Sequence, residues 1–451
     1  MLKRTSQMGL ILFALILVTS LLVFSGCSKG VNLKGAQITI ASWWQDYDTS
    51  TYDARSESEE KELDWRIKAE KEHGFKVVVE QISDFDNYFT LMVNNIMSGN
   101  KKFSIYQTEP SFVLTAQKQG LLYPVSRSKA VDFKNREIIP MVKHAYNGLV
   151  DNYMTIGGDT YGWTYGLPND TWMQAFLFFN PRFLVEAGLS AEHLYDLQKA
   201  NNWTWDTFLD VCRRLTRDTN NDGITDIYAL PIDDARQFLT GLIFGNGGDF
   251  VTMDAQGKAV NAVNSPAVIE AINFFNQLIT EGLVWTTPTY DWGQNWTAFV
   301  DQRVAMTFDP EWRKGQVDGL EIGYVLPPRG PRSSTLRLGA LDGAWVIPAF
   351  FSPEEVDVIL KASEIWNAPA EADWLQAHYW ASANLRDVTD SVAMSRDVRF
   401  ITPAYERIVA GYPFDDFIAE IRGEGLGNVN ASRMIESYMP SFQSAVDDFN
   451  R

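Results

Sequence analysis

The chain has 451 residues, of which 45% are hydrophobic and 21% charged, so a wholly disordered chain is excluded. This length predicts two large domains. The 39 basic and 57 acidic residues give a net charge of −18, which would repel phosphate backbones and argues against nucleic acid as the main partner. Fifteen tryptophans predict either a very aromatic core or a binding groove, because indole faces both pack and stack on ligands.

The first 30 residues have the pattern of an export signal. Lys3 and Arg4 form a basic start, an apolar run extends over 8–24, and small residues follow it. The last of these residues, Phe24-Ser25-Gly26-Cys27, resemble a bacterial lipobox, in which the cysteine is lipidated and becomes the mature N-terminus. We therefore predict a lipoprotein signal peptide over 1–26 and a lipid anchor on Cys27. The alternative is an uncleaved membrane anchor, and both interpretations place the remaining chain outside the cytoplasmic membrane.

The region after the signal alternates between strand and helix patterns. Strands are predicted over 37–41, 75–82 and 103–107, and helices over 56–73, 84–98 and from 110 onward. This alternation predicts an α/β domain with a mainly parallel sheet. Because ligands bind at the carboxyl ends of the strands in such sheets, we expect binding residues in the loops 43–48, 83–87 and 108–111.

The same kinds of element continue along the chain. A strand is predicted over 173–179, and capped helices follow over 205–216 and 266–280, with Thr204 and Ser265 as their caps. Further elements are predicted as a strand within 298–308, a strand over 344–347, and a helix over 353–366 that Ser352 caps. No internal repeat or low-complexity tract interrupts this pattern.

Several short motifs stand in an order that resembles the family 1 extracellular solute-binding proteins of ABC importers, the sugar-binding lipoproteins related to maltose-binding protein. Each motif is weak alone, but their order and spacing behind a lipobox support the resemblance over 37–449. The motifs are Tyr165-Gly166-Leu167-Pro168, Phe178-Phe179-Asn180-Pro181, Gly188-Leu189, Trp203-Thr204-Trp205-Asp206-Thr207-Phe208, Ser265-Pro266, Ala305-Met306, Pro310-Glu311-Trp312 and Val325-Leu326-Pro327.

The resemblance implies an α/β fold of the two-lobe periplasmic-binding-protein type (type II), with a hinge between the lobes. Lobe one would hold 31–170 and 339–385, and lobe two 171–338 and 386–451. The lobes would close around a carbohydrate, and the permease subunits of an ABC importer would recognise the closed form. The chain would be a monomer on the extracytoplasmic face of the cell membrane, held there by its lipid anchor.

A sugar site needs aromatic platforms for C–H faces, together with carboxylates and amides for hydroxyl groups. Trp43, Trp44 and Asp46 follow the first strand, and Glu109 follows the strand that ends near 107. Adjacent tryptophans on extended chain point to opposite sides, so we expect at least one of the two to contact ligand. The alternative for every candidate is that a tryptophan-rich protein packs these rings in its core.

The resemblance adds candidates at the inferred crossings between the lobes and in a turn of lobe two. Asp170 and Trp172 lie at the first crossing, and Asp342 and Trp345 at the return crossing. The turn contributes Asp309, Glu311 and Trp312, with Trp312 as the expected stacking ring. Trp292 and Trp296 are expected to be exposed and able to stack.

The segment 218–226 has the spacing of a calcium loop. Asp218, Asn220, Asp222 and Asp226 stand at positions 1, 3, 5 and 9, and the carbonyl of Ile224 would serve at position 7. A glycine stands at position 6, but position 12 is an alanine instead of the usual glutamate. Relatives with a similar loop bind calcium structurally, so the resemblance implies bound Ca²⁺. The alternative is an Asp-Gly turn held by side-chain hydrogen bonds.

Motifs of the common catalytic classes are absent: the sequence has no GxSxG, HExxH, P-loop or CxxC. We therefore predict a binding protein rather than an enzyme. The rival hypotheses are a secreted carbohydrate-active enzyme, in which Asp309 and Glu311 would be the carboxylate pair, and a binding protein for a solute that is not a sugar.

Overall fold

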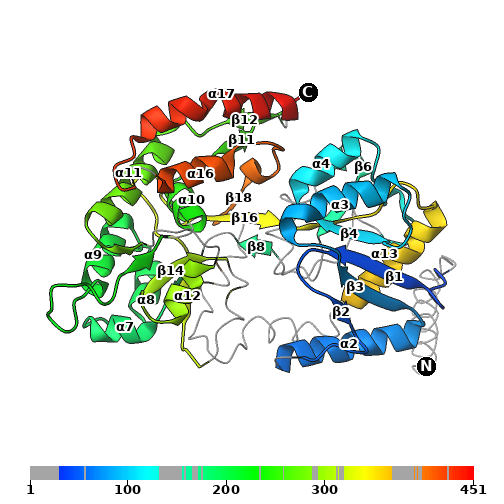
Figure 1. The fold of residues 1–451 in the computed structure, drawn as a ribbon, viewed down its shortest axis with the longest axis horizontal. Helices are drawn as coiled ribbons and strands as arrows, with labels where there is room; N and C mark the ends of the chain where they lie inside the picture. Colours follow the sequence, from blue (N-terminus) through cyan, green and yellow to red (C-terminus); the bar gives the residue numbers. More distant parts are fainter. Residues whose placement is uncertain are drawn as a thin grey trace, which may run out of the picture.

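The computed structural model describes residues 30–54, 57–131, 155–156, 159–164, 171–173, 176–232, 235–256, 258–286, 293–310, 313, 319–367, 391, 394, 399–423 and 426–451. The predicted signal peptide and Cys27 lie outside these residues. Among the helices of the described part, none is both long and apolar enough to cross a membrane. Two hydrophobic cores form two lobes, which lie side by side in Figure 1.

Lobe one is built on a six-stranded sheet in the order β2-β3-β1-β4-β17-β7. Strands β3, β1 and β4 are parallel to one another, whereas β2, β17 and β7 run antiparallel to their neighbours. The bounds are β1 (Gln37–Ser42), β2 (Tyr47–Asp48), β3 (Lys76–Gln81), β4 (Ile105–Thr108), β7 (Gly162–Thr164) and β17 (Ala344–Val346). A short hairpin, β5 (Thr155–Ile156) and β6 (Asp159–Thr160), accompanies the sheet.

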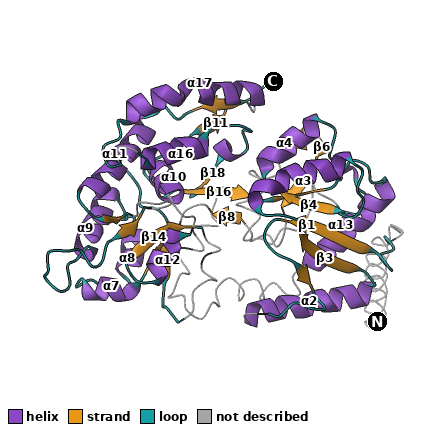
Figure 2. Ribbon diagram, in the orientation of Figure 1, coloured by secondary structure: helices purple, strands orange, loops and turns teal. Residues whose placement is uncertain are grey.

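Helices cover both faces of this sheet (Figure 2). On one face lie α3 (Phe85–Met97) and α4 (Pro110–Lys118), and on the other α2 (Glu57–His73) and α13 (Pro353–Asn367). The turn η1 (Val125–Arg127) packs near β6. Asp84 caps α3 by accepting from the N–H of Asn87, and Gly74 ends α2 with a φ of 74°.

Lobe two has a larger aromatic core and smaller sheets. Its central sheet is antiparallel in the order β14-β9-β15, and two strand pairs, β10-β13 and β11-β12, flank it. Its strands are β9 (Phe176–Phe179), β10 (Leu230–Pro231), β11 (Val251–Met253), β12 (Ala259–Asn261), β13 (Val284–Trp285), β14 (Met306–Asp309) and β15 (Gly323–Val325).

The helices of lobe two pack around these sheets. They are α7 (Pro181–Glu186), α8 (His193–Lys199), α9 (Trp205–Leu215), α10 (Ala235–Gly245), α11 (Pro266–Thr280), α12 (Gln294–Val300), η3 (Tyr405–Arg407), α16 (Phe414–Arg422) and α17 (Ala431–Phe449). Thr204 caps α9 and Ser265 caps α11, which confirms both predicted helix starts. The side chain of Ser352 likewise accepts from the N–H of Glu355 at the start of α13.

Two extended segments lead from one lobe to the other and pair with each other. Strand β8 (Thr171–Met173) follows β7 of lobe one and precedes β9 of lobe two, and β16 (Leu338–Asp342) precedes β17 of lobe one. They are antiparallel, and β16 also pairs with β18 (Ile401–Pro403). In Figure 1 this three-stranded sheet lies between the lobes. The single strand predicted over 173–179 is therefore wrong, because β8 pairs within the crossing and β9 within lobe two.

The crossing sheet is anchored to lobe two by a polar cluster. The Arg337 guanidinium, just before β16, donates to Asp249 Oδ1 over 3.2 Å and to Thr402 Oγ1 over 2.7 Å. Thr402 Oγ1 in turn donates to Asp249 Oδ1 over 3.1 Å. Because Thr402 belongs to β18, these bonds tie two of the three crossing strands to the loop after α10. Burial raises the pKa of Asp249, although Arg337 and Thr402 oppose that shift.

Candidate functional site

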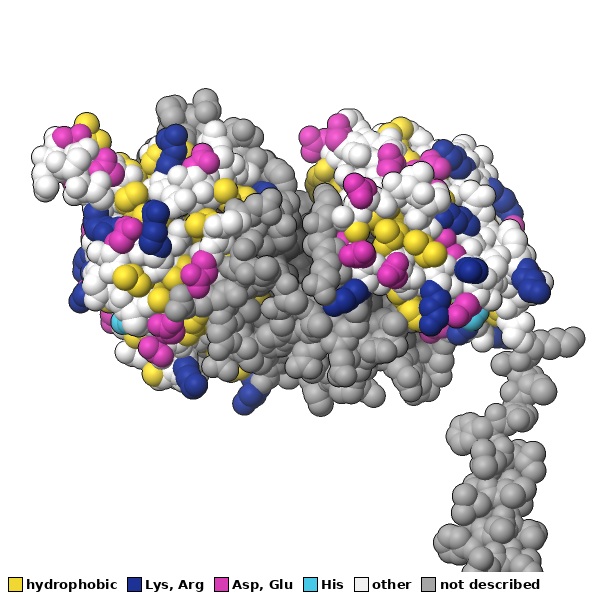
Figure 3. All heavy atoms as spheres, turned by 90° about the horizontal axis from the view of Figure 1, so that it is seen from below, with side chains coloured by type: hydrophobic (Ala, Val, Ile, Leu, Met, Phe, Trp, Pro, Cys, Tyr) yellow, Lys and Arg dark blue, Asp and Glu magenta, His cyan; other side chains and the backbone are white. Residues whose placement is uncertain are grey.

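The carboxyl edge of the lobe-one sheet faces the crossing to lobe two. Strands β3, β1 and β4 are parallel neighbours, so the loops that follow them leave the sheet at one edge. Ala344, the first residue of β17 after the crossing, pairs with Thr108 at the end of β4 and with Thr164 at the end of β7. The three loops predicted from the sequence therefore lie on the side of lobe one from which the chain passes to lobe two. Seen from below, the surface is notched between the lobes (Figure 3).

The two tryptophans after β1 have different surroundings. Trp43 is buried, and its ring lies 5.2 Å from that of Tyr88 and 5.7 Å from that of Phe85, centroid to centroid. Trp44 is 49% exposed. Both residues lie in a bend that follows β1, where Trp43 packs against residues of α3 and Trp44 does not share its burial. Trp44 is thus the tryptophan of this pair that is available to a solute.

Polar candidates lie beside these rings. Asp46 is exposed, and its Oδ1 accepts the backbone N–H of Gln81 at the end of β3 over 2.7 Å. That bond ties the loop after β1 to the neighbouring strand and fixes the carboxylate at the sheet edge. Glu109 stands at the N-terminus of α4 and is half-buried, and its side chain makes no capping hydrogen bond there. Both carboxylates can accept hydrogen bonds from hydroxyl groups.

The loops after β3 and β4 contribute further rings to the same edge. Phe85 is 43% exposed and contacts Phe89 at a centroid distance of 5.5 Å, and Phe89 stacks on Phe112 at 5.5 Å with 25° between the planes. Together with the two tryptophans these rings form one group, which we call the aromatic ridge: Trp43, Trp44, Phe85, Phe89 and Phe112. Sequence analysis identified the three loops but missed the phenylalanines. The available signal was that Phe85 is the single aromatic residue within the predicted loop 83–87.

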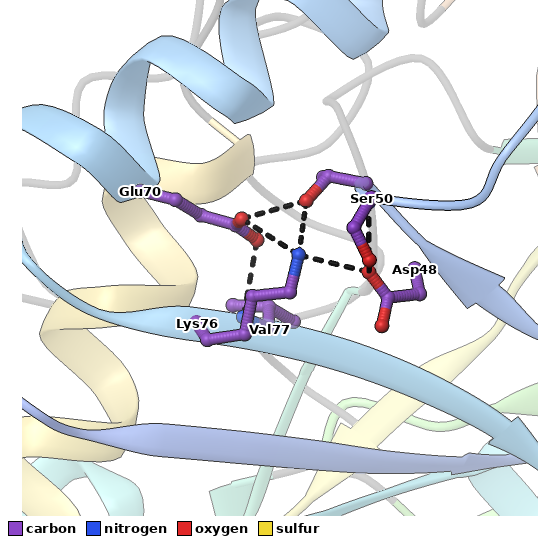
Figure 4. Close-up of polar contacts among 6 residues, drawn as sticks. Asp48, Ser50, Glu70, Lys76 and Val77 are labelled. Atoms are coloured by element: carbon purple, nitrogen blue, oxygen red, sulfur yellow. Dashed lines mark hydrogen bonds and ion pairs between the residues drawn. The ribbon is translucent and has the colours of Figure 1, made fainter.

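A partly buried ionic network supports the chain that leads away from Trp44 (Figure 4). Lys76 Nζ lies 2.9 Å from Asp48 Oδ1 and 3.0 Å from Glu70 Oε2, and it also donates to Thr49 Oγ1. Glu70 is buried and accepts from Thr49 Oγ1 over 2.7 Å and from the Val77 N–H over 3.1 Å. The network therefore joins β2 and its following turn to α2 and β3.

Charges within this network shift two pKa values. Hydrogen bonds from Ser50 and Lys76 lower the pKa of Asp48 to about 2. Burial opposes ionisation of Lys76, but its bonds to Asp48 and Glu70 outweigh burial and raise its pKa. Asp48 and Lys76 are thus charged at neutral pH, and together with Glu70 they hold the turn that follows β2.

The crossing candidates occupy neighbouring positions on paired strands. Trp172 on β8 pairs with Leu341 on β16, and the preceding residue Thr171 pairs with Asp342. Trp172 and Asp342 are therefore one position apart along the paired strands. Trp345 lies on β17 inside lobe one, where it is buried and meets Trp163 edge to face at 6.0 Å. Asp170 lies outside the described residues.

In lobe two, a buried ion pair lies at the end of β14. Asp309 accepts from Thr307 Oγ1 over 2.8 Å, and its Oδ1 lies 3.5 Å from Arg313 Nε. The residues between them in the chain include Glu311 and Trp312, which lie outside the described residues, as does Trp292. The expectation that Trp296 is exposed is wrong: it is 5% exposed and packs 5.3 Å from Phe178, because α12 turns this ring into the core.

The predicted metal loop protrudes after α9 (Figure 1) and is curled by its own side chains. Asp218 accepts the N–H groups of Asn220, Asp222 and Gly223, and Asp222 Oδ1 accepts the N–H of Ile224 over 2.8 Å. Asp226 Oδ2 accepts from Thr219, which lowers the pKa of Asp226. The oxygen donors are of the type that calcium prefers. Nowhere in the described residues are three or more acidic, histidine or cysteine side chains gathered for a metal ion.

The family model for bacterial extracellular solute-binding proteins matches residues 41–336, which is more than half of the chain. The chain belongs to this family. Its members are binding proteins rather than enzymes, as sequence analysis predicted. No curated protein matches the chain in a sequence search.

Solved structures of this kind resemble the whole molecule. The GacH receptor of Streptomyces glaucescens, solved without ligand and with acarbose, superposes with a TM-score of 0.60 at 17% identity, covering 90% of this chain and 98% of its own. The maltose-maltodextrin binding protein of Alicyclobacillus acidocaldarius gives 0.60 at 13%, covering 90% and 100%. UgpB from Mycobacterium tuberculosis, in complex with glycerophosphocholine, gives 0.62 at 14%, covering 92% and 99%. These superpositions establish the two-lobe fold. Because the sequence identities are low, the ligand has to be argued from the site itself.

Proposed function

We propose that this solute-binding protein captures a carbohydrate between its two lobes and delivers it to the permease subunits of an ABC importer. The observation that carries the proposal is the aromatic ridge with Asp46 and Glu109 beside it, at the edge of lobe one that faces the crossing. Rings take the apolar C–H faces of a sugar, and carboxylates accept its hydroxyl protons. Two of the solved relatives support the same class of ligand: the GacH receptor was solved with acarbose, and the Alicyclobacillus protein is a maltose-maltodextrin binding protein.

The second wall of the site would come from lobe two. We propose that Trp312 and Glu311 face the ridge when the lobes close, because the ion pair between Asp309 and Arg313 brackets their turn. Asp170, Trp172 and Asp342 remain proposed contacts at the crossing, whereas Trp345 is buried against Trp163 inside lobe one and is not proposed as a contact. A hinge motion at β8 and β16 would bring the two walls together.

A saccharide panel tests the proposal. Purified protein is screened by thermal shift against neutral mono- and oligosaccharides, with glycerophosphocholine and a tripeptide mixture as non-sugar probes. A ligand that binds only the folded state raises the melting temperature, so at least one saccharide should raise it and bind in calorimetric titration. The carbohydrate assignment is overturned if only a non-sugar probe binds.

The lipid anchor is proposed on the lipobox alone, since Cys27 lies outside the described residues. Cys27→Ala should leave an uncleaved precursor or release the protein into the medium, whereas the wild-type protein should fractionate with membranes. Mass spectrometry of the mature N-terminus checks this directly. A mature terminus elsewhere, without lipid mass, contradicts it.

We also propose that the loop 218–226 binds Ca²⁺. Asp218, Asn220, Asp222 and Asp226 would supply side-chain oxygens and Ile224 its carbonyl, which is the donor chemistry that calcium requires. Their exposed position on a protruding loop gives the ion a structural role far from the sheet edge that carries the ridge.

A further inference from the structure

The aromatic ridge presents two exposed rings, and they come from different loops. Trp44 follows β1 and Phe85 begins α3 after β3, with exposures of 49% and 43%. The two rings follow β1 and β3, which are parallel neighbours in the sheet, and large exposed rings that gather on one edge mark binding sites. Trp43 is buried and contacts Phe85 edge to face, so it backs the exposed ring from the core.

The position of Phe85 is held from its own helix. Asp84 caps α3 by accepting the backbone N–H of Asn87 over 3.1 Å and its side-chain amide over 2.9 Å. Phe89, one turn further on, contacts Phe85 and is itself stacked on Phe112. The ring of Phe85 is thus pre-organised before a ligand arrives, which reduces the entropic cost of binding.

The charged side chains of the segments that carry these rings are all of one sign. The loop segments 43–46, 82–87 and 108–112 contain four carboxylates and no lysine or arginine, namely Asp46, Asp84, Asp86 and Glu109. Carboxylates accept hydrogen bonds from hydroxyl or ammonium groups but repel another anion, and the repulsion grows when closure excludes water. The lobe-one wall therefore complements an uncharged or cationic ligand.

We propose that lobe one carries two sugar subsites, one on Trp44 and one on Phe85, so that the protein selects a saccharide of at least two rings, and that the four carboxylates of these loops make it select an uncharged or cationic one. The inference rests on the proposed function and narrows its substrate class. One pyranose ring covers about one aromatic face, so a monosaccharide occupies a single subsite. A disaccharide occupies both and gains the second stacking contact.

The experiment compares ligand length on matched variants. Calorimetric titration uses glucose, mannose and xylose with their β-1,4- and α-1,4-linked di- and trisaccharides, and galacturonate with digalacturonate as anionic probes. For a series that binds, wild-type protein should bind the disaccharide at least tenfold more tightly than the monosaccharide. Phe85→Ala should lose roughly ten- to hundredfold in disaccharide affinity, as when a stacking ring is removed elsewhere, and under threefold in monosaccharide affinity. Phe85→Tyr should retain both.

Leu91→Ala is the matched control. Leu91 lies on the same helix with 39% exposure, but it follows Phe85 by six residues and is therefore further from the sheet edge. Its substitution should leave both affinities unchanged. If no saccharide in the panel binds, the proposed function fails and this inference falls with it. If saccharides bind but Phe85→Ala lowers the affinities for monosaccharide and disaccharide equally, or lowers neither affinity, only the two-subsite inference is overturned. Tighter binding of digalacturonate than of any neutral disaccharide overturns the charge selection.

Discussion

Trp43 and Tyr88 meet edge to face, with ring centroids 5.2 Å apart and planes at 74°, and this contact ties the loop after β1 to α3. The Tyr88 hydroxyl donates to the backbone carbonyl of Ala41 over 2.8 Å, so the same helix residue also bonds the end of β1. Trp44, the next residue, is held at the surface as a consequence. A structural ring and an exposed ring are therefore adjacent in the chain.

Substitution of these two tryptophans should separate stability from affinity. Trp43→Ala removes a buried ring and should lower the free energy of unfolding by about 3–5 kcal/mol. Trp44→Ala leaves no cavity and should change stability by less than about 0.5 kcal/mol, while it weakens saccharide binding roughly ten- to hundredfold. Urea unfolding and calorimetric titration measure the two effects. Equal stability losses would show that Trp44 is also a packing residue.

The network around Lys76 should stabilise lobe one through Glu70. Glu70→Ala leaves the Thr49 hydroxyl, the Val77 N–H and one contact of Lys76 without their buried acceptor, and should cost about 1–3 kcal/mol of unfolding free energy. Glu72→Ala, an exposed glutamate on the same helix, is the control and should lie within about 0.5 kcal/mol of wild type. Indistinguishable unfolding curves for the two variants would contradict the role given to the network.

Acid should weaken the same network through Asp48. Its pKa is lowered to about 2, so its contribution is fully present above the ordinary pKa of an unfolded aspartate, near 4, and is lost as the pH falls toward 2. Asp48→Asn should therefore reduce the acid dependence of stability in that window and leave the dependence above pH 5 unchanged. Melting temperatures from pH 2.5 to 6 check this, and parallel curves for variant and wild type would refute it.

Glu406 should make the protein less stable as the pH rises. It is 3% exposed, and burial raises its pKa to about 8, well above the value near 4.5 of an unfolded glutamate. The folded state keeps the proton between these values while the unfolded state releases it, so unfolding free energy falls through this window by at most about 1.4 kcal/mol per pH unit.

Glu406→Gln removes that proton equilibrium. The variant should gain stability relative to wild type as the pH rises from about 4.5 to about 8, with no further gain above it. Urea unfolding at pH 5, 6.5, 8 and 9 measures the difference. A constant difference across this range would mean that Glu406 is ionised in the folded protein.

Calcium should stabilise lobe two. In metal-stripped protein, added Ca²⁺ should raise the melting temperature and a chelator should reverse the rise, because a ligand of the folded state stabilises it. Asp222→Ala should abolish the response, whereas Asp210→Ala, an exposed aspartate on the preceding helix α9, should keep it. If added Ca²⁺ does not change the melting temperature, the proposed calcium site in this loop is contradicted.

The local elements and the family could be predicted because their signals are short-range. Alternating apolar residues, capping residues such as Thr204 and Ser265, and Gly74 at a left-handed helix end act within a few residues of the chain. The strand order of lobe one and the pairing of β8 with β16 join segments far apart in sequence, and no local pattern specifies them. That is also why one predicted strand over 173–179 became two.

The sequence by itself predicted that these loops would share the carboxyl edge of the lobe-one sheet, since strands that alternate with helices favour a parallel sheet and parallel strands end together. It also led to the expectation that the neighbours Trp43 and Trp44 would not both point into one core. The tertiary structure alone decided which of them is buried, because Tyr88 and Phe85 on α3 cover Trp43. It likewise placed Phe85 on the exposed ridge and Trp296 in the core, since exposure depends on which distant elements pack against a residue.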